Sequence, residues 1–579
     1  MSFQHLKKNL KKDFTGLRSV KFALLGDSAT QFLAMAIRGS GHNAGLDIGV
    51  YEADYDLIYE TVLDPESKIY KDNFDYIILF HSSEKLVESF YKAGHEEQKN
   101  FAEKKDSYFR NIIATIQKNC KAGIIISNFP EINDSVFGNF ASKTPSSFLN
   151  RLRKINISLQ DIASETKNVF IADISSLVNN EGRKHAVSAK WYITSHNVFV
   201  LDFLPVVAKC FTDVIAALSG KFKKALILDL DNTMWGGIIG DDGIENIEIG
   251  ELGIGLAFTQ LQYWAKELKK RGILIGICSK NDEHIAKEVF EKHPDMILRM
   301  EDISIFIANW SNKGDNIKYI QEVLNIGMDS IVFIDDNPFE RNLVRTMCPE
   351  VTVPELPEDP ADYLSYLQSL NLFETVSHTE EDAFRTKQYQ EETKRVVMKQ
   401  SFESVDEYLA SLEMEAKVES INSFNLARCA QLTQRSNQFN LTTLRYTEEQ
   451  LKNFIKKGGK AICISLKDKF GDYGLISLLL LEKKDNTMHI NTWIMSCRVL
   501  KRGVEELAIN EAVQLGQQEG CSELHGIYLP TAKNGMVKLL YSTMGFEQIN
   551  DRESRLKCTN FAPLKSFIKK ADDIRTSNE

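Results

Sequence analysis

Apolar and polar positions alternate between two kinds of segment along most of this chain. Over about residues 20–215, short apolar runs such as KFALLGDS, YIILFHSS and GIIISNFP are separated by stretches with helical periodicity. That alternation predicts an α/β fold, in which helices cover a parallel sheet. A second section of the same kind begins at Lys223. A third section begins with a helix-like stretch and continues with GLISLLLLE and MHINTWIMS, which flank the turn KKDNT and predict a hairpin.

These patterns predict three domains, a linker and a tail. The prolines of Val351–Gln400 and the charged run EETKR indicate an exit from the second section and a partly helical linker. The expected boundaries are 1–220 and 221–380 for the two α/β domains, 381–401 for the linker, 402–560 for the third domain and 561–579 for a polar, loosely held tail.

Composition narrows the functional classes. The formal net charge of −10 argues against general binding of nucleic acids, because no basic excess exists to neutralise phosphates. No apolar run is long enough to span a bilayer, and the opening residues lack the apolar stretch of a secretory signal. The nine cysteines are scattered, with no CxxC pair. We therefore expect a cytoplasmic enzyme with reduced thiols.

The run ALILDLDNT carries the strongest chemical signal. It predicts a buried strand, Ala225–Leu230, that ends in two carboxylates. Residues two apart on a strand point the same way, so Asp229 and Asp231 face one pocket at the carboxyl end of a parallel sheet. One carboxylate can attack phosphorus and the other can protonate the leaving oxygen. A shared Mg²⁺ ion would remove the repulsion between the carboxylate and the phosphate.

Further candidate residues follow in order along the same section. Ser279 ends the strand Ile273–Ser279 and can hold a phosphoryl oxygen, and Lys313 stands just before the predicted helix Asn316–Leu324. We also expect phosphate contacts from Thr233 and Asn281. The strand IVFI ends in Asp335 and Asp336, and these carboxylates, with Glu340 farther on, can complete a magnesium shell.

These blocks resemble the four motifs of the haloacid dehalogenase superfamily, in the right order. The resemblance implies that Asp229 is the nucleophile and a metal ligand, and that Asp231 is the acid/base and binds metal through its backbone carbonyl. It implies that Ser279 and Lys313 hold the phosphoryl group and that Asp336, more than Asp335, is the distal metal ligand. A calcium loop is excluded because its last position, Gly240, is not a glutamate. The gaps between motifs are too short for a large cap domain, so an open site is expected.

WGGIIGDDG, CSKND, SNKGDNI and FIDDNPFER, followed by RSNQFNLTTLRYT and MSCRVLKRGVE, are similar to the FkbH-like proteins. The resemblance covers about residues 220–555. It implies an enzyme that takes the glyceryl group of 1,3-bisphosphoglycerate, loses phosphate and loads the acyl group on an acyl carrier protein. Other members of the family are described only as phosphatases.

The third section resembles the GNAT acetyltransferase fold. Arg498, Lys501, Arg502 and Gly503 precede a predicted helix whose N-terminus can bind an anion. Leu500 and Glu505 depart from the usual coenzyme A turn, which favours the phosphopantetheine of a carrier over free coenzyme A. Cys497 can be an acyl-carrying thiol beside Arg498, or a buried apolar residue.

The first section has a thinner resemblance to SGNH hydrolases, since GDS places Ser28 after a buried strand and His196 could be its base. Ile193 stands where an orienting Asp would be expected, so a domain that kept the sheet and lost the reaction is the other interpretation.

Three functions fit this sequence. The first is a haloacid dehalogenase-type phosphatase and glyceryltransferase that loads a carrier protein. The second is a plain Mg²⁺-dependent phosphatase of a small phospho-sugar or phospho-acid. The third is a scaffold that docks a carrier. The intact pair of Asp229 and Asp231 argues against the scaffold, and the third section argues against simple hydrolysis.

Overall fold

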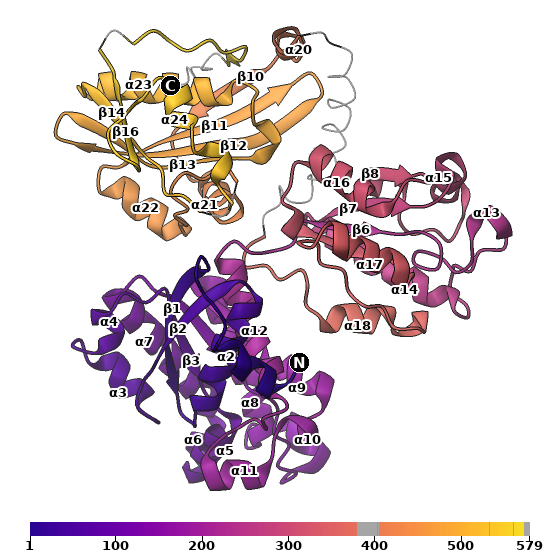
Figure 1. The fold of residues 1–579 in the computed structure, drawn as a ribbon. Helices are drawn as coiled ribbons and strands as arrows, with labels where there is room; N and C mark the ends of the chain where they lie inside the picture. The colour runs from indigo at the N-terminus through magenta and orange to yellow at the C-terminus, as the bar shows by residue number, and fades with distance from the viewer. Residues whose placement is uncertain (379–401, 403, 437, 532, 560, 572–579) are drawn as a thin grey trace, which may run out of the picture. The chain divides into compact units, whose positions relative to one another are not determined.

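The structure of this protein, a computed structural model, describes residues 1–378, 402, 404–436, 438–531, 533–559 and 561–571 (Figure 1). The expected linker 381–401 lies outside these residues. Contacts divide the chain into two compact units, Met1–Leu218 and Ser219–Glu579. No helix of the described part is both long enough and apolar enough to cross a membrane.

The first unit is built on a five-stranded parallel sheet in the order β2-β1-β3-β4-β5. Its strands are β1 (Arg18–Gly26), β2 (Leu46–Glu52), β3 (Tyr76–Phe80), β4 (Gly123–Ser127) and β5 (Val169–Ala172). Its helices are α1 (Phe3–Asn9), α2 (Gln31–Asn43), α3 (Ile58–Leu63), α4 (Lys68–Lys71), α5 (Ser83–Lys92), α6 (His95–Lys99), α7 (Phe101–Asn119), α8 (Phe148–Glu165), α9 (Ile174–Glu181), α10 (Arg183–Ala186), α11 (Ala189–Ser195) and α12 (Leu204–Leu218).

Both faces of this sheet are buried, which explains why its strands are continuous apolar runs rather than alternating ones. Ala23 and Leu25 of β1 belong to a core cluster that also contains Ile112 of α7 and Leu152 of α8. Phe22, one residue along β1, points to the other face and is also fully buried. The α/β prediction for this section is confirmed.

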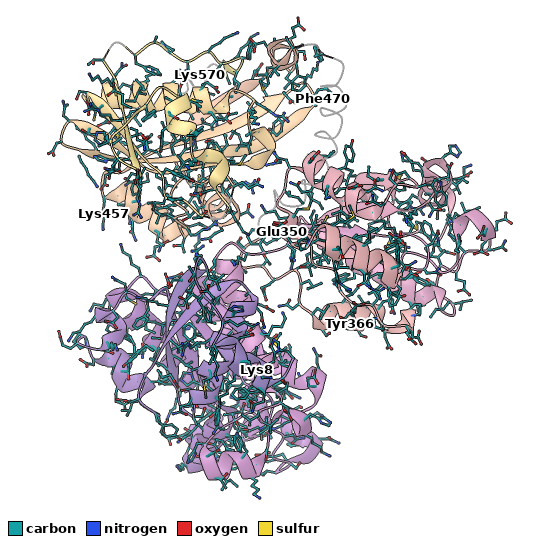
Figure 2. All side chains as sticks on the ribbon, in the orientation of Figure 1. Lys8, Glu350, Tyr366, Lys457, Phe470 and Lys570 are labelled. Carbon is teal, nitrogen blue, oxygen red and sulfur yellow. The ribbon has the colours of Figure 1, made fainter. Side chains whose placement is uncertain are left out.

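The second unit begins with a four-stranded parallel sheet in the order β8-β7-β6-β9. Its strands are β6 (Ala225–Leu228), β7 (Leu274–Ser279), β8 (Ile303–Ala308) and β9 (Ile331–Ile334). Its helices are α13 (Ile239–Asp242), α14 (Gly255–Lys270), α15 (Glu283–Lys292), α16 (Lys313–Leu324), α17 (Pro338–Met347) and α18 (Tyr363–Ser369), the last marked by Tyr366 in Figure 2.

Alternate residues of β6 face two separate cores, which makes this part a three-layer sandwich. Leu226 and Leu228 pack in the core that contains Phe258 of α14 and Ala286 of α15. Ala225 and Ile227 pack in the core that contains Ile317 of α16. The central strand therefore has no polar face, and its first carboxylate, Asp229, appears only where the strand ends.

The same unit ends with an eight-stranded sheet in the order β15-β16-β14-β13-β12-β11-β10-β17. Its strands are β10 (Glu415–Glu419), β11 (Lys460–Asp468), β12 (Gly471–Lys484), β13 (Thr487–Met495), β14 (Glu523–Ile527), β15 (Glu547–Gln548), β16 (Glu553–Lys557) and β17 (Lys569–Lys570). Its helices are α20 (Val405–Ser411), α21 (Leu426–Arg435), α22 (Glu448–Lys456), α23 (Val504–Gln518) and α24 (Leu540–Thr543). The predicted hairpin is confirmed as β12 and β13. Phe470 marks the turn that precedes β12 (Figure 2).

The element order here is that of a GNAT-like α+β domain. Two helices separate β10 from an antiparallel meander, and α23 then leads to β14, which runs parallel to β13. The prediction of a loosely held tail is wrong for its first part. Ile568 is buried, β17 pairs with β10, and the Ser566 hydroxyl donates to the Gly503 carbonyl at 2.9 Å, so these residues close the domain.

The close approach of α1 and α2 gives a prediction about stability. A Cβ added at Gly39 would lie 2.2 Å from the Leu6 carbonyl oxygen, and backbone cannot move aside as a side chain can. We expect Gly39→Ala to lower the free energy of unfolding of the first unit by about 1–3 kcal/mol. Calorimetry of the full chain would measure this. Gly49→Ala is the control, because its Cβ would make only ordinary van der Waals contacts, with the Lys21 side chain at 3.5 Å and the Val20 carbonyl oxygen at 3.9 Å. Equal losses in both variants would contradict the packing argument.

Candidate active site

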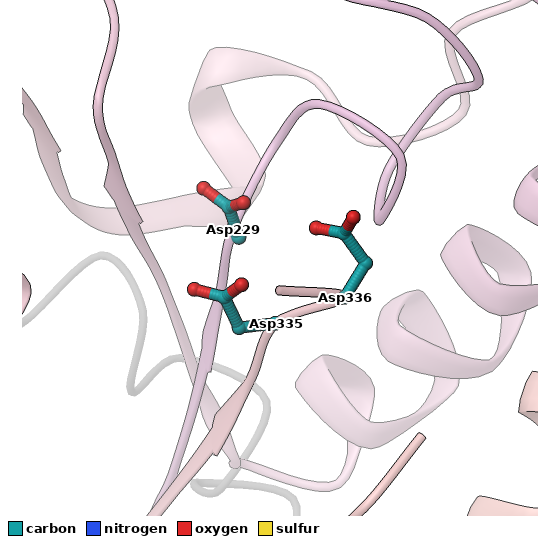
Figure 3. A group of neighbouring side chains, drawn as sticks. All are labelled: Asp229, Asp335 and Asp336. Carbon is teal, nitrogen blue, oxygen red and sulfur yellow. The ribbon is translucent and has the colours of Figure 1, made fainter. Parts of the chain in front are cut away.

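The carboxyl ends of β6 and β9 bring three aspartates together in the central sheet. Asp229 follows β6, and Asp335 and Asp336 follow β9, its neighbour in the sheet (Figure 3). One carboxylate oxygen from each of the three lies within 4.8 Å of the others. Asp335 is fully buried, Asp229 is 5% exposed and Asp336 is half-buried.

Lys313 is the cation of this group. It occupies the first turn of α16, where Asn312 caps the helix by accepting the Asp315 amide at 2.8 Å. The helix therefore starts earlier than the predicted Asn316. The Lys313 ammonium lies 2.8 Å from Asp229 Oδ1 and 2.6 Å from Asp335 Oδ2. Burial alone would lower the pKa of Lys313, but the two carboxylates outweigh it and raise that pKa, so the side chain is a permanent cation.

The remaining carboxylates carry uncompensated negative charge. Burial, followed by the charge of Asp229, raises the pKa of Asp336 to about 6. The same causes raise the pKa of Asp335, against the pull of Lys313. One ammonium cannot neutralise three carboxylates, and the buried Asp229 Oδ1 accepts no well-aligned hydrogen bond despite its contact with Lys313.

These observations fit a divalent cation. Hard oxygen ligands of this kind suit Mg²⁺, which binds protein through a few carboxylates and keeps other positions for water or substrate. Asp229, Asp335 and Asp336 are the residues that would hold it. Glu340, expected in the same shell, is instead paired with Lys280 at 2.6 Å.

Three donors fix the Asp231 carboxylate, which is not one of the three clustered carboxylates; the expected metal contact of its backbone carbonyl stays a prediction. The Trp235 indole and the Ile239 amide donate to its Oδ1 at 2.9 and 3.1 Å, and the Asn281 amide donates to its Oδ2 at 2.9 Å. Asn232, directly after Asp231, has φ +54°, so the chain turns sharply there. A carboxylate fixed in this way is positioned for proton transfer rather than for structural pairing with a cation.

The expected phosphate contacts have different outcomes. Ser279 and Asn281 lie together, since the Asn281 amide donates to Ser279 Oγ at 3.3 Å, and Asn281 connects them to Asp231. Thr233 differs from the expectation. It is fully buried, and its hydroxyl accepts the Asp336 amide at 3.1 Å, so it fixes the loop after β9 instead of facing an open site.

Two residues with a role here were missed in the sequence. Arg341 is buried and donates to the carbonyls of Asp335 and Asp336 at 2.8 and 2.5 Å, which fixes the loop that carries them. Trp235 fixes Asp231 through its indole. Both stand inside the blocks WGGIIGDDG and FIDDNPFER, but neither residue type suggests chemistry by itself, so only their contacts reveal the role.

In the third domain, the turn before α23 lines a cavity of about 510 Å³ with Lys501, Gly503 and Glu505. The expected basic patch is corrected here. Arg498 and Arg502 are buried: the Arg498 guanidinium donates to the Tyr473 carbonyl at 3.2 Å, and the Arg502 guanidinium donates to the Tyr473 hydroxyl. Lys501 is exposed. The Cys497 side chain lies outside the part that the structure describes.

Ser28 and His196 of the first unit form no catalytic pair. The Ser28 hydroxyl is buried without a hydrogen-bond partner among the described residues, and the His196 ring packs against Tyr55 and Tyr192. The two are joined only through the neighbouring backbone, where the Ala29 amide donates to the His196 carbonyl at 2.9 Å. A serine without a base in contact is not an activated nucleophile.

Some solved structures resemble the third domain weakly. The ribosomal-protein-S18-alanine N-acetyltransferase from Escherichia coli is 10% identical, with 25% of this chain and 96% of that chain covered and a TM-score of 0.21. Spermidine N-acetyltransferase from Vibrio cholerae, in complex with CoA and spermine, is 13% identical, with 25% and 95% covered and a TM-score of 0.20. Likeness at this level assigns no activity. No curated protein matches the chain.

A family model and a solved structure of much higher sequence identity also match this chain. A family model described as "FkbH, N-terminal domain" matches residues 21–216. The crystal structure of the N-terminal part of BF1531 from Bacteroides fragilis, which contains a phosphatase domain and is complexed with Mg, is 47% identical to this chain. The match covers 65% of this chain and 100% of that chain, with a TM-score of 0.63. With this identity over the whole of the solved relative, the chain belongs to the FkbH-like family.

Proposed function

We propose that this protein removes phosphate from a small phosphorylated acid at Asp229 and loads the acyl group on an acyl carrier protein. The observation that carries the first half is the buried group of Asp229, Lys313, Asp335 and Asp336 at the end of a parallel sheet. A Mg²⁺-bound relative with a phosphatase domain supports the same half.

Asp229 is the nucleophile of the proposed reaction. Its carboxylate oxygen attacks phosphorus, the bond from phosphorus to the substrate oxygen breaks, and an aspartyl-phosphate forms. Lys313 lies within ion-pair distance of Asp229 and holds a positive charge where the phosphoryl oxygens arrive. Asp229, Asp335 and Asp336 would hold Mg²⁺, which when bound would supply further positive charge against the incoming phosphate. Asp335 is already engaged by Lys313, which leaves Asp336 as the more available ligand.

Asp231 is the general acid and then the general base of the proposed reaction. It gives a proton to the substrate oxygen as that oxygen leaves, and it then takes a proton from the water that hydrolyses the aspartyl-phosphate. The three donors from Trp235, Ile239 and Asn281 keep its carboxylate in one orientation for both steps. Ser279 and Asn281 are the candidates for holding the phosphoryl oxygens beside it.

The acyl transfer rests on the family resemblance. For a donor such as 1,3-bisphosphoglycerate, the thiolate of the carrier's phosphopantetheine attacks the acyl carbon. The bond to the acyl phosphate oxygen breaks, inorganic phosphate leaves, and a thioester forms. The phosphate ester that remains on the acyl group is then removed at Asp229. The products are the hydroxyacyl thioester and two phosphates.

The turn before α23 supports a carrier rather than free coenzyme A. The Glu505 side chain folds back toward the N-terminus of α23, where its Oε1 accepts a hydrogen bond from the Lys501 amide at 2.9 Å. It is 7% exposed, and burial raises its pKa to about 7. A carboxyl group therefore occupies the place where this fold would otherwise cradle a pyrophosphate. The apolar part of the cavity, with Leu540 and Met544, can still take a neutral pantetheine arm.

A plain phosphatase remains the second candidate, since a phosphatase domain is all that the solved relative is described as containing. A docking scaffold is disfavoured, because a scaffold has no need to keep three carboxylates buried against one lysine.

Asp229→Asn should reduce hydrolysis of p-nitrophenyl phosphate by at least about a thousandfold, because it removes the nucleophile. Asp231→Asn should slow hydrolysis of a sugar phosphate much more than that of acetyl phosphate, because the sugar oxygen needs a proton to leave and an acyl phosphate does not. Steady-state rates with these substrates would measure this, with exposed Glu358→Gln as the matched control. Near-native turnover in Asp229→Asn would contradict the assignment of Asp229 as the nucleophile. Equal losses of rate on the sugar phosphate and on acetyl phosphate would contradict the role of Asp231 as general acid.

Mg²⁺ should stabilise the protein in a pH-dependent way. Asp336 and Asp335 have raised pKa values, so their protonation stabilises the folded protein at low pH. That stabilisation is lost as the pH rises through about 6. Mg²⁺ competes with those protons, so the rise in Tm on adding Mg²⁺ should be larger near about pH 8 than near about pH 5. Thermal denaturation with Mg²⁺ or a chelator would measure it. A pH-independent effect, or an undiminished effect in Asp336→Asn, would contradict the site.

Carrier loading is tested by incubating the protein with 1,3-bisphosphoglycerate, Mg²⁺ and a holo carrier, and measuring the intact mass of the carrier. We expect a glyceryl group with the wild type and a phosphoglyceryl group with Asp229→Asn, because thioester formation does not use Asp229. The apo carrier, which lacks phosphopantetheine, is the control. An unmodified holo carrier together with full phosphatase activity would leave the plain phosphatase as the function.

A further inference from the structure

The first unit contains a cavity at the point where the strand order of its sheet reverses. In the order β2-β1-β3-β4-β5, β2 lies on one side of β1, and β3, the next strand along the chain, lies on the other, and open α/β sheets bind ligands in the crevice at such a point. Here the loops after β1 and β3, together with α3, α5 and α7, line a cavity of about 440 Å³, a size typical of small-ligand sites. Its inner lining includes Asp27, His81, Ser82, Lys105 and Tyr108.

Lys105 is a cation without a counter-ion in this cavity. It projects from α7, is half-buried, and has its ammonium 5.4 Å from the centre of the Phe101 ring and 5.3 Å from that of Tyr108. Among the described residues it forms neither an ion pair nor a hydrogen bond. Burial lowers its pKa, opposed only by the charge of Asp27. A desolvated ammonium in this state gains most from a bound anion.

Asp27 is the acid of the same cavity. It is 8% exposed, and both of its carboxylate oxygens accept the Ser82 amide, at 2.9 and 3.0 Å. Burial, partly offset by that amide, raises the pKa of Asp27 to about 7. When it is protonated, Asp27 removes a repelling charge and offers a donor to an oxyanion.

His81 completes the inner wall as a neutral group. Burial, and then the charge of Lys105, lowers its pKa to about 3. Its Nε2 lies 3.2 Å from the Tyr108 hydroxyl, while its buried Nδ1 has no hydrogen-bond partner within the described chain. Farther out, Lys85 and Asp56 form an ion pair at 2.9 Å, and the exposed Glu60, Glu88 and Lys92 line the outer part of the cavity, so Lys105 is the cation of its inner part.

We propose that this cavity binds a small organic oxyanion, a carboxylate or a phosphate ester, with Lys105 as its counter-charge and the Asp27 carboxyl group beside it. The site binds and does not hydrolyse, because neither Ser28 nor His196 lines it. It is separate from the phosphoryl-transfer residues around Asp229, which belong to the other unit, so it stands whether or not the proposed function is correct.

The test is calorimetric titration of the full-length protein with L-lactate and with inorganic phosphate. Lys105→Met should weaken binding of the preferred anion at least about tenfold, the loss of one charge-assisted contact. Lys104→Met is the matched control, since Lys104 is the exposed neighbour on α7 and pairs with Glu97. Ligand-free Lys105→Met should be at least as heat-stable as the wild type, because it removes an uncompensated charge.

The two titrations also distinguish the ligand class. Tighter Lys105-dependent binding of lactate assigns a carboxylate, and tighter binding of phosphate assigns a phosphate ester. Phosphate that binds equally well to Lys105→Met is held elsewhere in the chain. If neither anion binds in a Lys105-dependent way, or if the Lys104 variant loses as much, the proposal is overturned.

The pH dependence is a second test. Affinity should fall severalfold as the pH rises through about 7, because ionised Asp27 repels the anion. In Asp27→Asn, which can still accept the Ser82 amide, affinity should not change over this range. That variant separates the effect of Asp27 from the effects of the other charged or titratable groups that line the cavity, which are Asp56, Tyr59, Glu60, His81, Lys85, Glu88, Lys92, Lys105 and Tyr108. An unchanged pH profile in Asp27→Asn would exclude this role of Asp27.

Discussion

The ammonium of Lys313, held between Asp229 and Asp335, is the interaction on which the central domain depends. Three carboxylates at the end of two strands would repel each other in a buried site, and one lysine from α16 only partly offsets them. The excess negative charge prepares the site for a divalent cation, and the cation in turn makes the site able to accept a phosphate. Stability and chemistry therefore rest on the same charges.

Parallel strands explain why both α/β parts carry their polar groups where they do. The inner strands of each sheet are buried on both faces, so a carboxylate appears there only after the last apolar residue, whereas the edge strand β2 carries Asp47 and Glu52. Asp27 follows β1 in the same way that Asp229 follows β6. The two sites then differ in their cation: Lys313 is paired with carboxylates, whereas Lys105 rests on aromatic rings and lacks an anion.

The third domain shows the opposite use of a buried carboxyl group. Glu505 satisfies the start of its own helix, and the neighbouring Arg498 and Arg502 bind within the domain. The cavity beside this turn has apolar lining residues, such as Leu540 and Met544, and charged ones, such as Lys501 and Glu506.

The sequence by itself determined the three sheets, the strand-end pair Asp229 and Asp231 and the order of the later motifs, because apolar periodicity and spacing are local properties. Which polar residues are buried and hydrogen-bonded within the protein follows from the tertiary structure. Thr233, Arg498 and Arg502 look free in the sequence, but contacts between segments distant in the chain bury them. The same contacts give Arg341 and Trp235 their roles and leave Lys105, within the described part of the chain, without an ion pair or hydrogen bond. Burial and pairing depend on neighbours that no local pattern specifies.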